Sequence, residues 1–418
     1  MNVAVSPSVP TGEIALPASK SVAHRALIAA SCSDKPCLLT GRFVGDDVSA
    51  TAECLRRLGA TVETVPDGLL VSPIASLPAK AELYVGASGS TLRFMLPVAV
   101  ALGVETSFSG TERLAARPIG DLIEELVRHG ATASSLTLPL TLGGKINEGV
   151  YRVNAGISSQ FITGLMLALP IVGGGKIVTE GKIVSKNYLD VTASVMRSFG
   201  VRVEEENGVF TVCGKYRSPS EFSVESDWSS AAFFAVCGAL GKGVTLTGLN
   251  LRSTQGDKAI LDCLKDSGAE VVATEKTVLI KRGNPKPFVF DVQNCPDAAP
   301  ALGVLAATAS GKSVLTGTER LKIKESDRSA EIVSMLRAFG AEATDYGDRI
   351  EIIGTGRLHG CKIDLPDDHR MAMSAAVAAS VAEGDSLLVN AECVSKSYPI
   401  FFDDFAKLGG KADVQSVL

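Results

Sequence analysis

The sequence repeats one local pattern six times, and this internal repeat constrains the fold more than any other feature. A short apolar strand, a cluster of small and polar residues and an Ala- and Gly-rich apolar run begin near Ile14, Leu83, Tyr151, Phe222, Phe288 and Lys362. A glycine that ends an amphipathic run recurs at Gly59, Gly130, Gly200, Gly268, Gly340 and Gly409, at steps of 71, 70, 68, 72 and 69 residues. A period this constant over the whole chain predicts a repeat architecture.

The fifth repeat illustrates the predicted elements. Residues 288–292 (FVFDV) alternate apolar and polar side chains as a half-buried strand does, and Asn294, Pro296 and Asp297 then provide cap and first-turn residues for a helix. That helix, through ALGVLAATA, is apolar nearly all round and must be buried. A strand, an amphipathic helix ending at Gly340 and two more strands follow. Each repeat is therefore predicted to be βαβαββ.

Three such repeats could surround their six helices with sheet, so we predict an α/β fold of two inside-out, barrel-like domains. The sixth repeat stops shortly after Gly409, and the N-terminal segments NVAVS and GEIALP have the character of its missing strands. We therefore predict a discontinuous domain of residues 1–18 plus 227–418, with repeats four to six, and an inserted domain of residues 19–226. The chain would cross between the domains twice, which predicts a hinge and an interdomain cleft.

Composition excludes several classes of function. The chain has 418 residues, a net charge of -5 and 5% aromatic residues, which disfavours nucleic-acid binding. Its nine cysteines form no C-x-x-C pair and its four histidines lie far apart, so we expect reduced thiols and no metal site. The first residues do not resemble a signal peptide and the apolar runs are too short to span a membrane. We expect a cytoplasmic protein.

Cations stand at the predicted helix starts. Lys20, Arg25, Arg93 and Arg370 enter helices that are otherwise apolar, and further cations precede the second helices of several repeats. Helix N-termini attract anions, so this concentration on an acidic protein favours a small ligand with several negative charges. Asp297 and Glu325 lie in the same motifs and are candidates for acid/base chemistry, although Asp297 could equally be a helix cap.

At this point a family can be recognised. PASKSVAHRAL, SGSTLRF, AARPIG, SSQF, SKNYLDVT, PDAAP, KIKESDR, DDHRMAM and VSKSYP resemble, in this order, the EPSP synthase (3-phosphoshikimate 1-carboxyvinyltransferase) family of enolpyruvyl transferases. The resemblance implies two inside-out α/β domains of three repeats each. It implies transfer of the enolpyruvyl group of phosphoenolpyruvate to the 5-hydroxyl of shikimate 3-phosphate, with phosphate release, in the shikimate pathway to chorismate and aromatic amino acids. It also implies no cofactor, no metal and a monomer.

Roles carry over by matching position. The resemblance implies catalysis by Asp297, Glu325 and Lys20, with the division of proton transfers among them left open. The implied shikimate 3-phosphate set is Lys20, Ser21, Arg25, Ser158, Ser159, Gln160, Ser185, Asp297, Arg320 and Lys324, with Tyr188 near the ring. The implied phosphoenolpyruvate set is Lys20, Gly89, Arg117, Gln160, Arg328, Arg370 and Lys396.

Two positions depart from the family pattern, and two rival functions remain. Ala87 stands where many relatives have Asn, which removes one side-chain contact to phosphoenolpyruvate, and Arg320 replaces the Asn of many bacterial relatives. The resemblance also implies sensitivity to glyphosate, because a side chain larger than that of Gly89 would crowd this inhibitor. The nearest rival is UDP-N-acetylglucosamine 1-carboxyvinyltransferase, whose family has a Cys in the loop that reads ERLAARP here. The second rival is a non-catalytic polyanion-binding protein.

Overall fold

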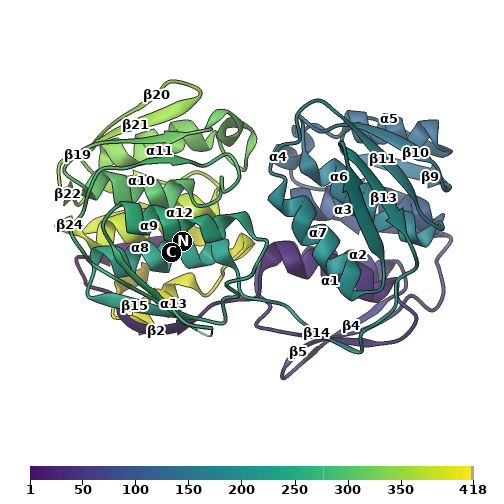
Figure 1. Cartoon of the computed structure of the whole chain (residues 1–418), viewed down its shortest axis with the longest axis horizontal. Helices are drawn as coiled ribbons and strands as arrows, with labels where there is room; N and C mark the ends of the chain where they lie inside the picture. The colour runs from purple at the N-terminus through teal and green to yellow at the C-terminus, as the bar shows by residue number, and fades with distance from the viewer. Residues whose placement is uncertain (276, 416–418) are drawn as a thin grey trace. The chain divides into compact units, whose positions relative to one another are not determined.

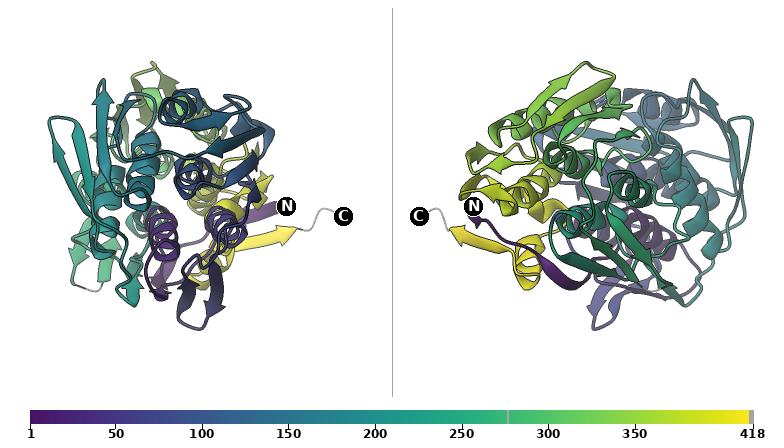
Figure 2. Two further views of the ribbon diagram at one scale, coloured as in Figure 1. Left: turned by 90° about the vertical axis from the view of Figure 1, so that its right-hand side faces the viewer. Right: turned by 60° about the vertical axis from the view of Figure 1, so that its left-hand side comes forward.

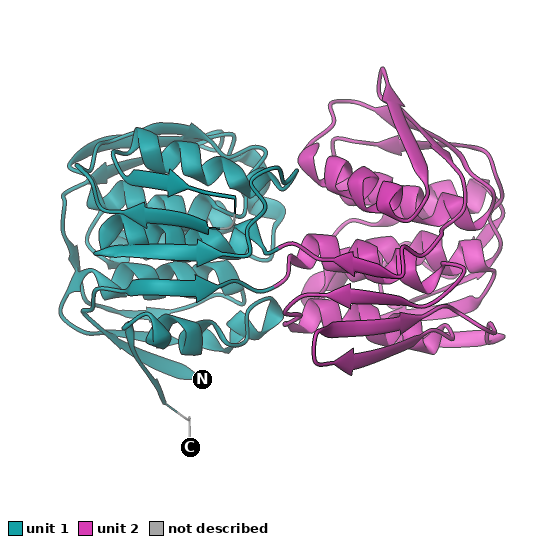
Figure 3. Cartoon of the chain, turned by 60° about the horizontal axis from the view of Figure 1, so that its bottom comes forward, with its two compact units in different colours: residues 1–17, 226–418 teal, residues 18–225 magenta. Residues whose placement is uncertain are grey.

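The computed structural model describes residues 1–275 and 277–415, so residues 276 and 416–418 of the predicted range 227–418 lie outside the described residues. The chain forms two compact units (Figure 3). Unit 1 consists of residues 1–17 and 226–418, and unit 2 of residues 18–225. Each unit has its own core of buried apolar side chains.

Unit 2 contains three four-stranded sheets among its residues, one for each of the first three repeats. The first repeat comprises α1 (Lys20–Ser31), β3 (Cys37–Thr40), α2 (Asp46–Arg57), β4 (Thr61–Val65), β5 (Gly68–Ser72) and β14 (Glu221–Ser223). The second comprises β6 (Lys80–Tyr84), α3 (Gly89–Leu102), β7 (Glu105–Ser109), α4 (Glu112–Ala115), α5 (Gly120–Arg128), β8 (Ala131–Ala133) and β9 (Leu140–Gly144). The third comprises β10 (Val150–Asn154), α6 (Ser159–Ala168), η1 (Leu169–Ile171), β11 (Gly175–Glu180), α7 (Asn187–Ser198), β12 (Arg202–Glu206) and β13 (Val209–Cys213).

Unit 1 repeats this arrangement in its described part. The fourth repeat comprises β2 (Thr11–Ala15), α8 (Trp228–Leu240), β15 (Gly243–Thr247), η2 (Gly256–Ala259), α9 (Ile260–Asp266), β16 (Glu270–Ala273) and β17 (Thr277–Lys281). The fifth comprises β18 (Val289–Asp291), α10 (Ala299–Thr308), β19 (Gly311–Thr316), η3 (Glu319–Ile323), α11 (Arg328–Ala338), β20 (Glu342–Asp345) and β21 (Arg349–Gly354). The sixth comprises β22 (Leu358–His359), β23 (Lys362–Asp364), α12 (His369–Ser380), β24 (Ala382–Glu383), β25 (Ser386–Val389), η4 (Ala391–Lys396), α13 (Phe401–Lys407), β26 (Lys411–Gln415) and β1 (Asn2–Ser6).

The first helix of each repeat lies inside its unit, as its apolar sequence predicts. In α8, α10 and α3 nearly every side chain is buried. Figure 1 shows the strands of each unit arranged around its helices. The approach of α3 and α6 is close, because a Cβ added at Gly164 would lie 2.3 Å from the carbonyl oxygen of Arg93. The predicted α/β fold class is confirmed.

The glycines that mark the period serve the same purpose in all six repeats. Each follows the second helix of its repeat with a positive φ, which L side chains rarely adopt. The φ values are 103° at Gly59, 106° at Gly130, 79° at Gly200, 89° at Gly268, 89° at Gly340 and 86° at Gly409. The period of the sequence is therefore the period at which the chain must turn out of a helix.

The first strands of repeats one and four lie in different units from the helices that follow them, and the sequence pattern did not indicate their partner strands. β2, which precedes α1 in the chain, pairs in parallel with β15 of the fourth repeat. β14, which precedes α8, pairs in parallel with β3 of the first repeat. The chain thus leaves each unit between a strand and the helix that follows it. Beside these crossings, the Asp227 amide donates to Pro17 at 2.9 Å and the Ser19 amide donates to Glu225 at 2.8 Å.

One N-terminal strand completes the sheet of the sixth repeat. β1 lies between β25 and β26 and is antiparallel to both, as Figure 2 shows for the purple β1 and the yellow β26. The expectation that GEIALP also belongs to this sheet is wrong, because that segment is β2 of the fourth repeat. The sequence near the C-terminus already supplies β26, so a single strand was missing.

Candidate functional site

In unit 2 the starts of the helices α1, α2, α3 and α6 gather polar side chains, which we call the unit 2 site. Lys20, the first residue of α1, places its Nζ atom 2.9 Å from Asp47 Oδ2 on α2. Gln160 on α6 accepts from Arg93 Nη1 at 3.0 Å and donates to Ser90 Oγ at 2.9 Å, both on α3. The repeat therefore brings helix starts from different parts of the sequence together.

Two arginines lie beside Gly89 in this site. A Cβ at Gly89 would lie 2.7 Å from Arg93 Nη1 and 2.8 Å from Arg117 Nη1. The Nε atom of Arg117 is buried and has no hydrogen-bond partner among the described residues. The absence of a side chain at residue 89 thus lets two guanidinium groups lie directly against the start of α3, and such a pair of arginines suits an anionic ligand.

Arg25 is a predicted ligand whose donors already bind protein atoms. Its Nε donates to Thr192 Oγ1 at 2.7 Å and its Nη2 to the Tyr188 carbonyl at 3.1 Å, and only 2% of the residue is exposed. Burial lowers the pKa of Arg25 to about 9. The arginine packs α1 against α7 and positions the start of α1 rather than presenting a free guanidinium.

In unit 1 the corresponding helix starts carry both cations and carboxylates, which we call the unit 1 site. Arg328 is fully buried and donates to Asp297 Oδ1 at 2.7 Å and to Glu325 Oε2 at 2.7 Å. It also donates from Nε to Asp368 Oδ2 at 3.0 Å. One guanidinium therefore fixes three carboxylates from three segments of the unit.

Asp297 is the centre of this network. Besides Arg328, it accepts from Arg370 Nη2 at 3.1 Å, and Lys324 Nζ lies 3.8 Å from its Oδ1. Burial alone would raise the pKa of Asp297, but Arg370, Lys324 and Arg328 outweigh it and hold that pKa well below its usual range. Asp297 is thus an ionised carboxylate, and the resulting site combines a proton acceptor with three cations.

Asp368 and Asp227 show that other carboxylates have local tasks. Asp368 is the N-cap of α12, where it accepts from the Arg370 amide at 3.0 Å, and Asp227 is the N-cap of α8. Capping satisfies the free amides of the first turn. Asp297 does not cap α10 in this way, since residue 298 holds the cap position without a side-chain bond. The capping interpretation of Asp297 is therefore wrong.

The predicted site residues divide between the two units. Unit 2 contains Lys20, Ser21, Arg25, Gly89, Arg117, Ser158, Ser159, Gln160, Ser185 and Tyr188. Unit 1 contains Asp297, Arg320, Lys324, Glu325, Arg328, Arg370 and Lys396, and the contacts described above join Asp297, Lys324, Glu325, Arg328 and Arg370. Ser158 is the N-cap of α6, and Ser185 adopts a φ of 51° just before α7. Arg25 and Arg328 are predicted ligands whose guanidinium groups are already bound by the protein itself.

Sequence reasoning missed two buried carboxyl groups at these sites. Asp47, which pairs with Lys20, is 4% exposed. Asp257 lies in η2, beside the start of α8, and is also 4% exposed. Both look like ordinary first-turn acids in the sequence. Their position after a glycine, in Gly45-Asp46-Asp47 and Gly256-Asp257, was the available signal, but their burial depends on the helices around them.

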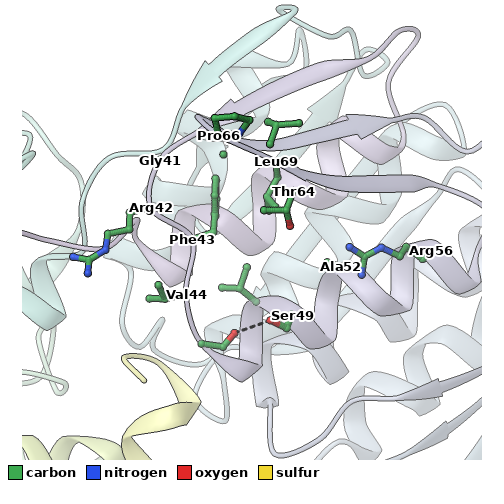
Figure 4. Close-up of a pocket in the computed structure, with 14 residues that line it drawn as sticks. Gly41, Arg42, Phe43, Val44, Ser49, Ala52, Arg56, Thr64, Pro66 and Leu69 are labelled. Atoms are coloured by element: carbon green, nitrogen blue, oxygen red, sulfur yellow. Dashed lines mark hydrogen bonds between the residues drawn. The ribbon is translucent and has the colours of Figure 1, made fainter. Parts of the chain in front are cut away.

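A separate pocket of about 330 Å³ opens in unit 2, and none of the predicted site residues lines it. The segment Gly41–Gly45, α2 and the turn between β4 and β5 form its walls (Figure 4). Arg56 at its edge uses its guanidinium to donate to the Val62 carbonyl. The pocket offers no arrangement of charges like that of the two sites. In the part of the chain that the structure describes, no helix is long and apolar enough to cross a membrane.

The fold is that of the enolpyruvyl transferases. The structure superimposes on EPSP synthase from Acinetobacter baumannii with a TM-score of 0.84 and 26% identity, covering 99% of this chain and 100% of that chain. The enolpyruvyl transferase NikO from Streptomyces tendae shares the fold, with a TM-score of 0.77 and 16% identity over 99% of this chain and 98% of that one.

Sequence comparisons identify the particular family. The EPSP synthase (3-phosphoshikimate 1-carboxyvinyltransferase) family profile matches residues 6–405. The 3-phosphoshikimate 1-carboxyvinyltransferase of Clostridium kluyveri is 38% identical over 422 residues, covering 99% of both chains, and that of Clostridium novyi is 36% identical over 100% of this chain and 99% of the relative. The chain belongs to the EPSP synthase family and is a transferase. The predicted family is confirmed, and neither rival function is supported.

Proposed function

We propose that this enzyme transfers the carboxyvinyl group of phosphoenolpyruvate to the 5-hydroxyl of shikimate 3-phosphate and releases inorganic phosphate. In the addition step the hydroxyl oxygen bonds to C2 of phosphoenolpyruvate, its proton leaves and a proton is delivered to the methylene carbon. In the elimination step the C2–O bond to phosphate breaks and the methyl group loses a proton. The observation that carries the proposal is the ionised Asp297 held among Arg328, Arg370 and Lys324, on a chain of this family.

Asp297 is our choice for the base at the hydroxyl. A carboxylate with a strongly lowered pKa is a weak base, because its cations stabilise the ionised form. Anionic substrate groups that engage Arg370 and Lys324 would withdraw part of this stabilisation. The pKa of Asp297 would then rise toward its usual range, and the carboxylate would become a better proton acceptor when substrate is bound.

Glu325 and Lys20 are our choices for proton delivery to the methylene carbon. Arg328 fixes the Glu325 carboxylate at 2.7 Å, and Asp47 holds the Lys20 ammonium at 2.9 Å. Both groups are only partly exposed, at 15% and 16% of their side chains. Because their partners hold these two side chains in place, each can deliver a proton in a fixed orientation.

The cations of the two sites would stabilise the charge that develops on the transferred phosphate. We propose that phosphoenolpyruvate engages Lys20, Gly89, Arg117, Gln160, Arg328, Arg370 and Lys396. We propose that shikimate 3-phosphate engages Lys20, Ser21, Ser158, Ser159, Gln160, Ser185, Asp297, Arg320 and Lys324, with Arg25 supporting the start of α1. Electrostatic stabilisation by fixed donors is often the largest contribution to such a rate.

We further propose that the two compact units are the two domains of a cytoplasmic monomer. The proposed ligand set of each substrate contains residues of both units. No cofactor takes part in the proposed chemistry, because acid/base groups and cations suffice for each step.

The direct test measures phosphate release from phosphoenolpyruvate with shikimate 3-phosphate and, separately, with UDP-N-acetylglucosamine. We expect release with the former substrate. Release with UDP-N-acetylglucosamine alone would replace the proposal by the rival transferase, and release with neither would refute it.

Two substitutions test the assigned residues. Lys20→Met and Asp297→Ala should each lower kcat by at least about 100-fold, because each removes a group proposed to move a proton. Lys35→Met and Asp364→Asn are matched controls at exposed positions and should keep the parent rate. If either active-site variant keeps near-full turnover, its assignment is wrong.

Glyphosate is proposed to inhibit the enzyme in competition with phosphoenolpyruvate, because residue 89 carries no side chain that would displace Arg93 and Arg117. Gly89→Ala should weaken the inhibition, since its Cβ would crowd both guanidinium groups. Inhibition that is not competitive with phosphoenolpyruvate would contradict this part of the proposal.

A further inference from the structure

Asp257 is a buried carboxyl group at the unit 1 site that the proposed mechanism does not use. It lies in η2 beside the start of α8, where its Oδ2 accepts a hydrogen bond from Ser229 Oγ. Its Oδ1 is buried and has no hydrogen-bond partner among the described residues. The preceding Gln255 already binds the α8 start, accepting from the Trp228 amide at 3.1 Å. Capping of α8 therefore leaves half of the Asp257 carboxyl unexplained.

The charged groups that face Asp257 come from several elements, and two of these three groups are carboxylates. Asp227 comes from the start of α8, Asp297 from the segment before α10 and Arg370 from α12, with Cys295 nearby. The neighbouring Lys258 turns away, since its ammonium donates to the carbonyls of Leu251 and Ser253 at 3.0 Å each.

These surroundings favour the neutral form of the carboxyl. Burial, and then the charge of Asp297, raise the pKa of Asp257 to about 7, while Arg370 and the Ser229 hydrogen bond oppose the rise. An ionised Asp257 would be another negative charge near the guanidinium of Arg370, which already pairs with Asp297 at 3.1 Å. An anionic substrate must compete with those charges for Arg370.

We propose that Asp257 is a positioning residue: its carboxyl carries a proton while Asp297 is ionised, and it thereby leaves the guanidinium of Arg370 available to an anionic substrate. The inference rests on the proposed function, in which Arg370 binds phosphoenolpyruvate. Loss of the Asp257 proton weakens phosphoenolpyruvate binding, so the enzyme responds to pH through a group that touches neither substrate.

The test compares kcat/KM for phosphoenolpyruvate between pH 6 and pH 9 in the parent enzyme and in Asp257→Asn. Asn keeps the size of Asp and can accept from Ser229, but it cannot ionise. We expect kcat/KM of the parent to fall above about pH 7 relative to the variant, reaching a difference of about tenfold at pH 8.5 that lies mainly in KM. The two profiles should converge near pH 6, where Asp257 is protonated. Ionisation of the substrates is common to both proteins and cancels in the comparison.

Two further variants sharpen the test. Ser229→Ala removes the hydrogen bond that opposes protonation, so it should move the fall in kcat/KM to higher pH. Asp262→Asn is the matched control, since this side chain lies on α9 and is 76% exposed. It should follow the parent profile.

The possible failures can be told apart. Parallel profiles of the parent and Asp257→Asn would overturn the inference, because ionisation of Asp257 would then have no effect on kcat/KM for phosphoenolpyruvate. A loss in Asp257→Asn that is equal at every pH and accompanied by a lower melting temperature would assign Asp257 a structural role and also overturn it. Absence of phosphate release by the parent at any pH would instead refute the proposed function, and the inference with it.

Discussion

Arg328 offers the sharpest test of how unit 1 is held together. Its side chain and that of Asp368 are both fully buried, and the guanidinium also binds Asp297 and Glu325, whose side chains are each 15% exposed. Arg328→Met keeps most of the volume but leaves three carboxylates without this cation. Breaking a buried ion pair from one side costs about 3 to 5 kcal/mol.

The expected loss follows mainly from Asp368. Asp297 keeps Arg370, and Glu325 can recover water, whereas Asp368 keeps the neutral donors Ser326 Oγ at 3.1 Å and the Arg370 amide at 3.0 Å and loses its arginine partner. We therefore expect Arg328→Met to lower the free energy of unfolding by about 4 kcal/mol. The double variant Arg328→Met/Asp368→Asn removes the uncompensated charge and should recover about 2 kcal/mol of that loss.

The assay is urea unfolding followed by tryptophan fluorescence. Trp228, the only tryptophan of the sequence, is fully buried in α8 of the same unit, so its emission reports the unfolding of unit 1. Arg349→Met is the control, because this arginine pairs with Asp348 and Glu351 at the surface and such pairs contribute at most about 1 kcal/mol. A loss below about 1 kcal/mol for Arg328→Met, or no recovery in the double variant, would refute the reasoning.

The remaining predictions concern unit 2. The His24 side chain is fully buried and burial lowers its pKa to about 3, so its contribution to stability is present above pH 6.5 and is lost as the pH falls from 6.5 toward 3. Between pH 7.5 and 4.5 the loss of stability from His24 amounts to about 2 to 3 kcal/mol. His24→Asn should therefore flatten the pH dependence of amide hydrogen exchange in α1. Parallel pH curves of the parent and the variant would contradict this prediction. Gly164→Ala places a Cβ 2.3 Å from the Arg93 carbonyl oxygen and 2.9 Å from Pro97 Cγ, so α3 and α6 must separate. We expect a loss of about 1 to 3 kcal/mol in chemical unfolding monitored by circular dichroism, and an unchanged midpoint would show that the helices adjust freely.

Much of the candidate site was predictable because it follows the repeat. Polar and charged side chains stand at the helix starts, at equivalent positions of the repeats. The pattern of residues alone therefore singles out Lys20, Gln160, Asp297 and Arg370. The sequence did not indicate which carboxylate would bind which cation. Arg328 could have been a solvated residue of a charged loop, and only the packing of α11 against α12 and the segment before α10 makes it the partner of three acids.

The same division holds for the fold. The sequence by itself determined the six repeats, the buried first helices and the glycines after the second helices, because these depend on the side-chain pattern and backbone preferences of neighbouring residues. The tertiary structure alone decided that β2 pairs with β15 and β14 with β3, and that Asp47 and Asp257 are buried. Strand partners and the burial of a carboxyl depend on segments that lie far away in the chain. The first-strand patterns of repeats one and four are alike, so local sequence could not assign either strand to its sheet.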